Sequence, residues 1–420
     1  MKFTFAAALA FVPLTLPAAP LPAGDATAAG FSSERLERVH RLAQGYVDEA
    51  KCAGAITLIA RDGKIVDVRT YGWRDVAAKL PMERDSLLRI YSLTKPVMAV
   101  MTLMLWEEGR FSLDDPIANY LPEFKDLKVQ AGGSVDQPML EAARPVTIRH
   151  LLTHTSGISY DWNAKPGVQS RYQTAKLFEY PTLPDFARAL AQIPLNFQPG
   201  DEFLYGHNFD VLGYLIEKVT KQPLETVLQE RLFGPLRMSD TFFTIPPEKR
   251  GRLALVHRRN AAGQLVAEPP DPVTARALGG NAFPNGSGGL ISTADDYARF
   301  AQMLLNGGEL DGVRLLSPKT VALMAADHLK QIKTPTSFMG AAGTYGFGVG
   351  VWHAGSGNDS PGSEGRFGWT GYATTYCNID PVEGTVALVF AQHVPYDEFG
   401  LFSRFSTTFY QAMIESRAKR

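Results

Sequence analysis

A serine and a lysine three residues apart, Ser92 and Lys95 in the segment RIYSLTKPVM, have the types and the spacing to do chemistry. If a helix begins at Ser92, both side chains lie on one face of it, about one turn apart. A lysine beside a hydroxyl can take the hydroxyl proton, especially where burial lowers the affinity of the amine for protons. The common alternative is an N-cap serine followed by a solvated lysine. The turns that follow are almost entirely apolar, which favours a buried nucleophile and its base.

A tyrosine, Tyr205, lies in DEFLYGHNFDVLG, where a loop after Pro199-Gly200 meets a predicted helix. A phenol has a reference pKa of about 10. It therefore accepts a proton only if a neighbouring ammonium group stabilises the phenolate. A tyrosine ahead of a helix is otherwise a packing residue. Tyr205 is thus a candidate proton acceptor that needs a cation beside it.

A third candidate segment runs from Gly368 to Tyr372, with the sequence GWTGY ahead of a predicted strand. Two glycines around a bulky ring indicate that the backbone approaches a ligand closely. An exposed backbone N–H in this segment could complete an oxyanion hole with the N–H of Ser92. A plain glycine-rich turn explains the pattern equally well.

Other kinds of site find no support. The Gly-x-Ser-x-Gly motif of α/β-hydrolases does not occur, and the eight histidines have no metal-ligand spacing. We interpret His154 as a structural polar residue and GSGGL at 286–290 as a structural turn, with Ser292 or Thr293 capping the next helix. The net charge is -1, so no basic excess points to nucleic acid or to an anionic membrane surface. No metal or cofactor is implied.

Strand-like runs lie at both ends of the chain, with helices between them. GAITLIA and KIVDVRTYG form a predicted hairpin through Asp62-Gly63, and YGFGVGVW, YATTYCNID and GTVALVFAQ are predicted strands near the C-terminus. Helices are expected over 33–49, from Ser92, over TIRHLLTHTSG as far as Gly157, and over 402–416.

The predicted fold class is α/β of the α+β type, with one antiparallel sheet built from both chain ends and flanked by helices. A mainly helical region is inserted between the two halves of the sheet. The predicted domains are an α/β domain formed by residues 31–110 and 285–420, and a mainly helical domain over 111–284.

Residues 1–30 are predicted to be a signal peptide and a disordered N-terminus. Lys2 is followed by an apolar stretch from Phe3 to Leu16, and Ala26-Thr27-Ala28 is a candidate cleavage site. The stretch is short for a transmembrane helix, so we expect export, to the periplasm, without stable membrane insertion. An uncleaved N-terminus is the alternative. Cys52 and Cys377 are predicted to be buried free thiols.

Together these segments resemble the serine β-lactamase and penicillin-binding superfamily, and most of all class C β-lactamases and family VIII carboxylesterases. The resemblance runs from about Phe31 to the C-terminus. Besides Ser92-x-x-Lys95 it includes LLTHTSGI from Leu151, LFGPLRMSDTFF from Leu232, GSGGLISTADDYARF from Gly286 and YGFG from Tyr345. It implies a β-lactamase-like fold, with Ser92 as nucleophile, Lys95 as the amine that handles its proton and Tyr205 as the partner base.

Two departures from the family pattern concern substrate binding. His207 stands where the tyrosine motif usually has an asparagine, so an amide-binding role there is in doubt. Trp369-Thr370-Gly371 replaces Lys-Thr-Gly, whose lysine holds the carboxylate of a β-lactam or peptide. A tryptophan cannot pair a carboxylate, but it can contact an apolar acyl or alcohol group, and family VIII esterases carry one there. A competing anchor, His353-Ala354-Gly355, follows the YGFG segment too closely to fit the pattern.

The resemblance therefore implies a carboxylesterase that acts on small, short-chain esters. Ser92 would attack the ester carbonyl, the N–H groups of Ser92 and Tyr372 would hold the oxyanion, and Tyr205 would protonate the leaving alcohol. The alternatives are a class C-like β-lactamase or D-alanyl-D-alanine peptidase, and a non-catalytic binding member of the superfamily. The acyl acceptor, water or another alcohol, stays open, as does the oligomeric state.

Overall fold

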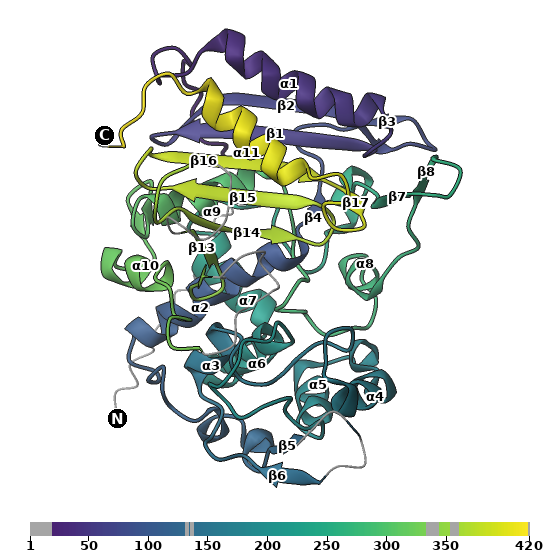
Figure 1. Ribbon diagram of the computed structural model, residues 1–420, viewed down its shortest axis with the longest axis vertical. Coiled ribbons are helices and arrows are strands. Elements are labelled where there is room, and N and C mark those ends of the chain that lie inside the picture. Colours follow the sequence, from purple (N-terminus) through teal and green to yellow (C-terminus); the bar gives the residue numbers. More distant parts are fainter. Residues whose placement is uncertain (1–18, 131–133, 135–137, 333–343, 353–360, 419–420) are drawn as a thin grey trace, which may run out of the picture.

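The protein is built around one antiparallel sheet to which both ends of the chain contribute strands (Figure 1). The computed structural model describes residues 19–418 except 131–133, 135–137, 333–343 and 353–360. The sheet has eight strands in the order β12-β13-β14-β15-β16-β1-β2-β3. Their bounds are β1 Gly54–Arg61, β2 Lys64–Asp75, β3 Leu80–Pro81, β12 Thr344–Tyr345, β13 Gly350–Val351, β14 Phe367–Gly371, β15 Thr375–Asp380 and β16 Thr385–Ala391.

The two central strands, β1 and β16, are buried along their whole length. Helices cover both faces of the sheet, and this is why these strands are mostly apolar instead of alternating regularly with polar residues. Helices α1 (Ser33–Asp48) and α11 (Leu401–Ala412) pack side by side on one face. Helix α9 (Ala294–Leu305) packs on the other face, against β1, β15 and β16. Helix α2 (Thr94–Glu107) belongs to the same hydrophobic core as α9.

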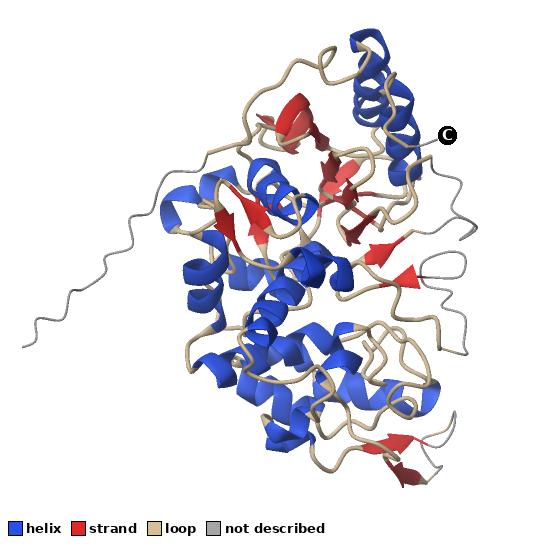
Figure 2. Cartoon of the chain, turned by 90° about the vertical axis from the view of Figure 1, so that its left-hand side faces the viewer, coloured by secondary structure: helices blue, strands red, loops and turns tan. Residues whose placement is uncertain are grey.

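The helical region lies at the end of the molecule away from α1 and α11 (Figures 1 and 2). It contains α3 Ile148–Leu152, α4 Pro166–Ala175, α5 Leu183–Leu190, α6 Asn208–Thr220 and α7 Leu224–Leu228, with a π-helical turn at Gln229–Phe233. Helix α2 packs on α6 and is buried from Thr94 to Leu105. Because α2 is enclosed by the sheet on one side and by the helical region on the other, its first turn lies where the two parts meet.

Smaller strands and helices surround this frame. They are β4 Leu88–Arg89 with β9 Ile291–Ser292, β5 Lys128–Gln130 with β6 Met139–Glu141, β10 Glu309–Leu310 with β11 Val313–Arg314, and β7 His257–Arg259 with β8 Leu265–Ala267 and β17 His393–Val394, besides α8 Pro272–Ala277 and α10 Pro318–Met324. The stretch 111–284, predicted to be mainly helical, thus includes the β5–β6 pair and two strands, β7 and β8, of a three-stranded sheet. The third strand of that sheet comes from the C-terminal part of the chain.

Several predicted elements have different ends. The helix expected at Ser92 begins as a 3₁₀ turn, η1 (Tyr91–Leu93), ahead of α2. Helix α3 ends at Leu152, well before Gly157, because His154 has the left-handed φ of 55°. YGFGVGVW forms only the short strands β12 and β13, and GWTG is itself strand β14. The final helix ends at Ala412 instead of 416.

Other expectations are confirmed. The β1–β2 hairpin turns at Asp62-Gly63, where both residues have positive φ, and Thr293 caps α9 through its side chain. Cys52 and Cys377 are buried free thiols. The fold class is as predicted: mixed helices and strands around a large antiparallel sheet.

The segment just before α1 is packed on the sheet. Leu21 is buried, the N–H of Gly24 donates to the carbonyl of Ile65, and the N–H of Ile65 donates to the carbonyl of Pro22. The prediction of a disordered N-terminus is therefore wrong for residues 19–30, while the apolar stretch of the predicted signal peptide lies outside the described residues. Within the described part of the chain, no helix has the length and apolar character needed to cross a membrane.

Candidate active site

Ser92 lies in a tight turn that is wedged against strand β14. Tyr91, just before it, has a φ of 43°, a left-handed conformation that is unfavourable for a non-glycine residue. The hydroxyl of Tyr91 donates to Oδ2 of Asp271 at 2.7 Å, which holds this conformation. Gly371 lies so close to the turn that a Cβ on it would stand 2.3 Å from the carbonyl oxygen of Ile90.

The glycines of the GWTGY segment thus allow a close approach between parts of the chain itself. A Cβ on Gly368 would lie 2.0 Å from the carbonyl oxygen of Cys377, across the β14–β15 pair. A close approach of this backbone to a ligand stays a prediction. Tyr372 follows β14, is exposed, and meets Tyr91 edge to face at 5.7 Å between ring centroids. The segment that carries the Tyr372 backbone N–H therefore lies beside the turn that carries the N–H of Ser92.

The amine of Lys95 is enclosed and within reach of Ser92. Its Nζ lies 3.2 Å from Ser92 Oγ, 3.4 Å from the hydroxyl of Tyr160 and 2.6 Å from the carbonyl oxygen of Ser287. Lys95 is completely buried. Burial lowers the pKa of the Lys95 amine to about 7, although the carboxylate of Asp210 acts in the opposite direction. The proximity that the spacing predicts is present, and the amine can be neutral near physiological pH.

Tyr205 lies against the same amine. The Nζ of Lys95 is 4.3 Å from the centroid of the Tyr205 ring, and the indole N–H of Trp369 donates to the Tyr205 hydroxyl at 3.3 Å. Burial raises the pKa of the Tyr205 phenol, although hydrogen bonds with Ser92 and Trp369 lower it. The phenol therefore remains protonated at neutral pH. Of the two groups predicted to take the proton of Ser92, Lys95 is the one whose basic form, the uncharged amine, is available near neutral pH.

The residues predicted to bind substrate lie in different environments. Trp369 is buried, and its ring meets Tyr345 edge to face. Because its indole N–H donates to the Tyr205 hydroxyl, Trp369 helps to position Tyr205. Thr370 bonds through its hydroxyl to the hydroxyl of Tyr396 at 2.8 Å. His207 is buried, and its Nδ1 lies 2.8 Å from Oδ2 of Asp210. The competing anchor at His353-Ala354-Gly355 lies outside the described residues.

Three features of the site carry no distinctive sequence pattern. Tyr160 contacts Lys95 from the loop after α3. Asp210 on α6 accepts from the backbone N–H of Ser287 at 3.0 Å, and the carbonyl of Ser287 in turn accepts from Lys95. The GSGGL turn, interpreted above as structural, thus touches the candidate base through its backbone. Every residue has a backbone carbonyl, so the amino-acid sequence cannot indicate this contact, and only the position of GSGGL in the fold reveals it.

His154 has the structural role predicted for it. It is buried among aromatic rings, 4.5 Å from the Tyr205 ring by centroids, and its Nδ1 lies 2.8 Å from the amide nitrogen of Asn208. Burial, with Lys95 nearby, lowers its pKa well below the usual value, so the ring is neutral. Chemically, the site therefore combines a hydroxyl, an amine that can be neutral near pH 7 and protonated phenols in an enclosed environment.

Comparisons with known proteins agree with this geometry. The family model described as Beta-lactamase matches residues 39–403. Protein Rv1367c of Mycobacterium tuberculosis is 37% identical over 360 residues, which cover 83% of this chain and 88% of the relative. Esterase EstB of Burkholderia gladioli is 34% identical over 267 residues, 60% of this chain and 65% of the relative.

Among solved structures, EstCE1, described as a hydrolase with promiscuous acyltransferase activity, superposes with a TM-score of 0.76 at 26% identity. The match covers 91% of this chain and 98% of EstCE1. Since the family model spans most of the chain and the fold agrees, the chain belongs to the beta-lactamase family of serine hydrolases, which includes esterases and acyltransferases among its relatives.

Proposed function

We propose that the protein is a carboxylesterase that cleaves small, short-chain esters through an acyl-enzyme on Ser92. The observation that carries the proposal is the buried amine of Lys95, 3.2 Å from Ser92 Oγ, with a pKa lowered to about 7. An uncharged amine in that position can take the proton of the serine hydroxyl as it attacks. A lysine with an ordinary pKa would be an ammonium ion and could not.

In the acylation step, Ser92 Oγ bonds to the ester carbonyl carbon while its proton moves to Nζ of Lys95. The carbonyl oxygen becomes an oxyanion, which the backbone N–H groups of Ser92 and Tyr372 hold. The tetrahedral intermediate then expels the alcohol. The protonated Lys95 and the hydroxyl of Tyr205 return a proton to the leaving oxygen, and Ser92 carries the acyl group.

In the second step, water attacks the acyl-enzyme and gives up a proton to the same Lys95–Tyr205 pair. Ser92 leaves as the hydroxyl and the carboxylic acid is released. Esters suit this site better than β-lactams because the position of the carboxylate-binding lysine is taken by Trp369. Its indole N–H is directed at Tyr205, so it supplies no cation for a substrate carboxylate.

The test is a pair of steady-state rates, on a short-chain p-nitrophenyl ester and on nitrocefin, with Ser92→Ala as control. We expect turnover of the ester, little turnover of nitrocefin, and loss of ester turnover in Ser92→Ala. Nitrocefin turnover equal to or faster than ester turnover would favour the β-lactamase alternative. Ester turnover at the wild-type rate in Ser92→Ala would mean that another group is the nucleophile.

Acyl transfer to an alcohol is the second candidate, because EstCE1 is described as a hydrolase with promiscuous acyltransferase activity. The two reactions share the acyl-enzyme and differ only in the acceptor. Adding increasing amounts of a primary alcohol to the ester assay and quantifying both products separates them. A new ester that forms at the expense of the acid, and only with Ser92 present, would support transfer.

A further inference from the structure

The three most exposed aromatic side chains in the described part of the chain gather around the candidate active site. They are Trp162, Tyr372 and Tyr396, which are 58%, 54% and 48% exposed. Each of them contacts a residue that belongs to the site or adjoins Ser92. One exposed ring needs no explanation, but a group of such rings around one site indicates a surface that binds a ligand.

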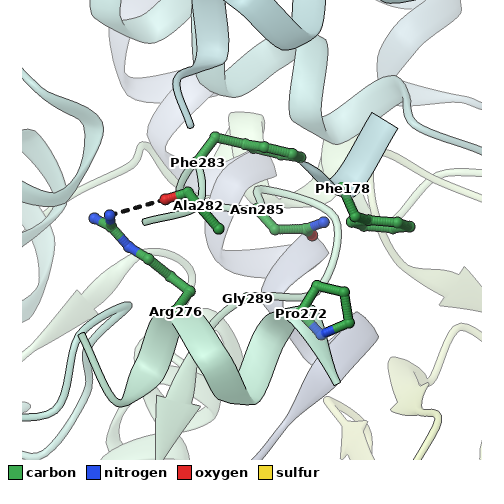
Figure 3. A pocket seen from close by; sticks show the side chains of 7 residues that line it. All are labelled: Phe178, Pro272, Arg276, Ala282, Phe283, Asn285 and Gly289. Carbon is green, nitrogen blue, oxygen red and sulfur yellow. Dashed lines mark hydrogen bonds between the residues drawn. The ribbon is translucent and has the colours of Figure 1, made fainter. Parts of the chain in front are cut away.

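The hollow shown in Figure 3 does not compete for this role. The side chains of Phe178, Phe283 and Pro272 line it, and it has room for only about one water molecule. The dashed bond in Figure 3 runs along its edge, from the guanidinium of Arg276 to the carbonyl oxygen of Ala282 at 2.9 Å. A substrate group larger than a water molecule therefore has to be bound elsewhere.

Trp162 is linked to the candidate base by one intervening ring. Its indole stacks on Tyr160, with 5.8 Å between the ring centroids and 17° between the planes. The hydroxyl of Tyr160 lies 3.4 Å from Nζ of Lys95, and its ring centroid is 5.7 Å from that of Tyr205. The stack of Trp162 on Tyr160 thus begins at the buried amine and the buried phenol and ends in solvent.

The turn that carries Trp162 is tied to the backbone of Tyr205. The side-chain amide of Asn163 donates to the carbonyl of Tyr205 at 2.8 Å, and its Oδ1 accepts from the N–H of Tyr160 at 3.0 Å. Because Trp162 stands between Tyr160 and Asn163 in the chain, these bonds hold its backbone in place relative to Tyr205. A ring that is already positioned can bind a flat group with little loss of conformational entropy.

Tyr396 approaches the same phenol from another part of the fold. Its hydroxyl bonds to that of Thr370 at 2.8 Å, and its ring meets Phe402 edge to face at 5.5 Å between centroids. Thr370 follows Trp369 on strand β14, and the indole N–H of Trp369 donates to the hydroxyl of Tyr205. The helical region thus contributes one exposed ring beside Tyr205, and the C-terminal part of the chain contributes the other.

Tyr205 marks the place where the alcohol leaves. In the proposed mechanism its hydroxyl returns a proton to the leaving oxygen, so the alcohol part of the ester lies next to it. Trp162 is connected to Tyr205 through Tyr160, and Tyr396 is connected to it through β14. The two exposed rings are therefore placed to contact the alcohol part of the ester.

We propose that Trp162 and Tyr396 bind the alcohol part of the ester, and that the preferred substrates join a short acyl group to a flat, aromatic alcohol. This inference rests on the proposed esterase function and names the alcohol within its substrate class. The face of an indole or a phenol ring stacks best on another flat ring, so shape and apolar area decide the selection. Trp162 is a specificity-determining residue in this assignment, separate from the groups that move protons.

The experiment compares phenyl acetate with 2-naphthyl acetate, which share the acyl group and differ in the size of the flat alcohol. Each kcat/KM is divided by the rate of hydroxide-catalysed hydrolysis of the same ester, which removes the difference in leaving-group reactivity. In the wild type we expect the naphthyl ester to exceed the phenyl ester about fivefold, the worth of one added aromatic contact. In Trp162→Ala we expect that ratio to fall to between about one and two, because one of the two rings is lost.

The matched control is Trp73→Ala, at an exposed tryptophan on strand β2, which should keep the wild-type ratio. A second pair of esters, 4-nitrophenyl acetate and 4-nitrophenyl 2-naphthylacetate, varies the acyl group and keeps the alcohol constant. The ratio within this pair should be the same in Trp162→Ala as in the wild type. A further variant, Tyr396→Leu, removes the other ring and should also lower the naphthyl-to-phenyl ratio. It decides the question if Trp162→Ala does not fold.

The outcomes separate the two proposals. If the acetates are turned over through Ser92 but the wild-type naphthyl-to-phenyl ratio is about one, or the ratio persists in Trp162→Ala, the assignment of the rings is wrong and the esterase proposal stands. A change confined to the acyl pair would place the rings beside the acyl group and overturn the assignment to the alcohol. If the enzyme turns over none of these esters, the proposed function itself fails, and the assignment of the rings fails with it.

Discussion

At the residue scale, the ionisation of Lys95 governs the proposed chemistry. Burial penalises the ammonium form, whereas Ser287 and the carboxylate of Asp210 favour it. The other titratable groups that face the amine are Tyr160, Tyr205 and His154. Burial raises the pKa of both phenols and lowers that of the imidazole, so all three are uncharged at neutral pH. Asp210 is thus the charged group that sets the proton affinity of Lys95.

The expected pH dependence follows from this balance. The neutral amine is the active form, so kcat/KM for an ester should fall as the pH drops through about 7, the pKa of Lys95. In Asp210→Asn the negative charge is lost, while the amide oxygen can still accept from the N–H of Ser287. The pKa of Lys95 then falls further, and the midpoint of the acid limb should move down by about one pH unit.

The measurement is kcat/KM from pH 5 to 9 for the wild type and for Asp210→Asn, with spontaneous ester hydrolysis subtracted. A purely structural role of Asp210 would lower the whole profile without moving its midpoint. A midpoint that stays fixed or moves to higher pH would therefore show that Asp210 does not act on Lys95 through its charge. His207 is connected to Lys95 only through Asp210, to which its Nδ1 is hydrogen-bonded.

At the scale of elements, the packing of β14 against the turn before α2 determines where Ser92 lies. Gly371 is at the point of contact, with the carbonyl of Ile90 on one side and Oγ1 of Thr375 on the other. Thr375 begins strand β15, and Ile90 precedes the turn that carries Ser92. A side chain at Gly371 would have to separate the two elements, because neither neighbour is the free end of a flexible chain.

We therefore expect Gly371→Ala to lower the free energy of unfolding by about 2–4 kcal/mol and to lower ester turnover at least tenfold. The matched control is Gly251→Ala, where no atom lies within 4 Å of the added Cβ and the effect should stay within about 0.5 kcal/mol. Chemical denaturation and ester assays on the two variants test this. Equal stability of both variants would mean that β14 is not held tightly against the turn.

At the scale of the whole molecule, the N-terminal segment is part of the folded domain. Leu21 is buried, and Pro22 and Gly24 exchange backbone hydrogen bonds with Ile65 of β2. Cleavage at Ala26-Thr27-Ala28, the candidate site in the sequence, would remove these contacts. Export to the periplasm, which we propose from the apolar N-terminal stretch, preserves these contacts only if cleavage occurs before Leu21.

We accordingly expect the exported protein to begin upstream of Leu21, and a chain that begins after Ala28 to be less stable by about 1–3 kcal/mol. Intact-mass analysis of protein recovered from the periplasmic and cytoplasmic fractions tests the first point, and thermal unfolding of the truncated chain tests the second. A mature chain that begins after Ala28 and unfolds at the same temperature as the longer one would contradict both.

The sequence by itself determined the features that depend on neighbours along the chain. The three-residue spacing of Ser92 and Lys95 predicts their proximity, because residues three apart on a helix share a face. The alternation of strands and turns at both ends predicts the antiparallel sheet, and Asp62-Gly63 predicts its hairpin. The family resemblance adds the fold and the class of chemistry, since several motifs occur in the expected order.

Only the tertiary structure decided the environment of these groups. Lys95 bonds to Tyr160 and to Ser287, 65 and 192 residues away in sequence, and the indole of Trp369 bonds to Tyr205 over 164 residues. The burial that lowers the pKa of Lys95 comes from the enclosure of α2 between the sheet and the helical region. Desolvation and long-range hydrogen bonds depend on packing in space, so no local pattern of residue types encodes them.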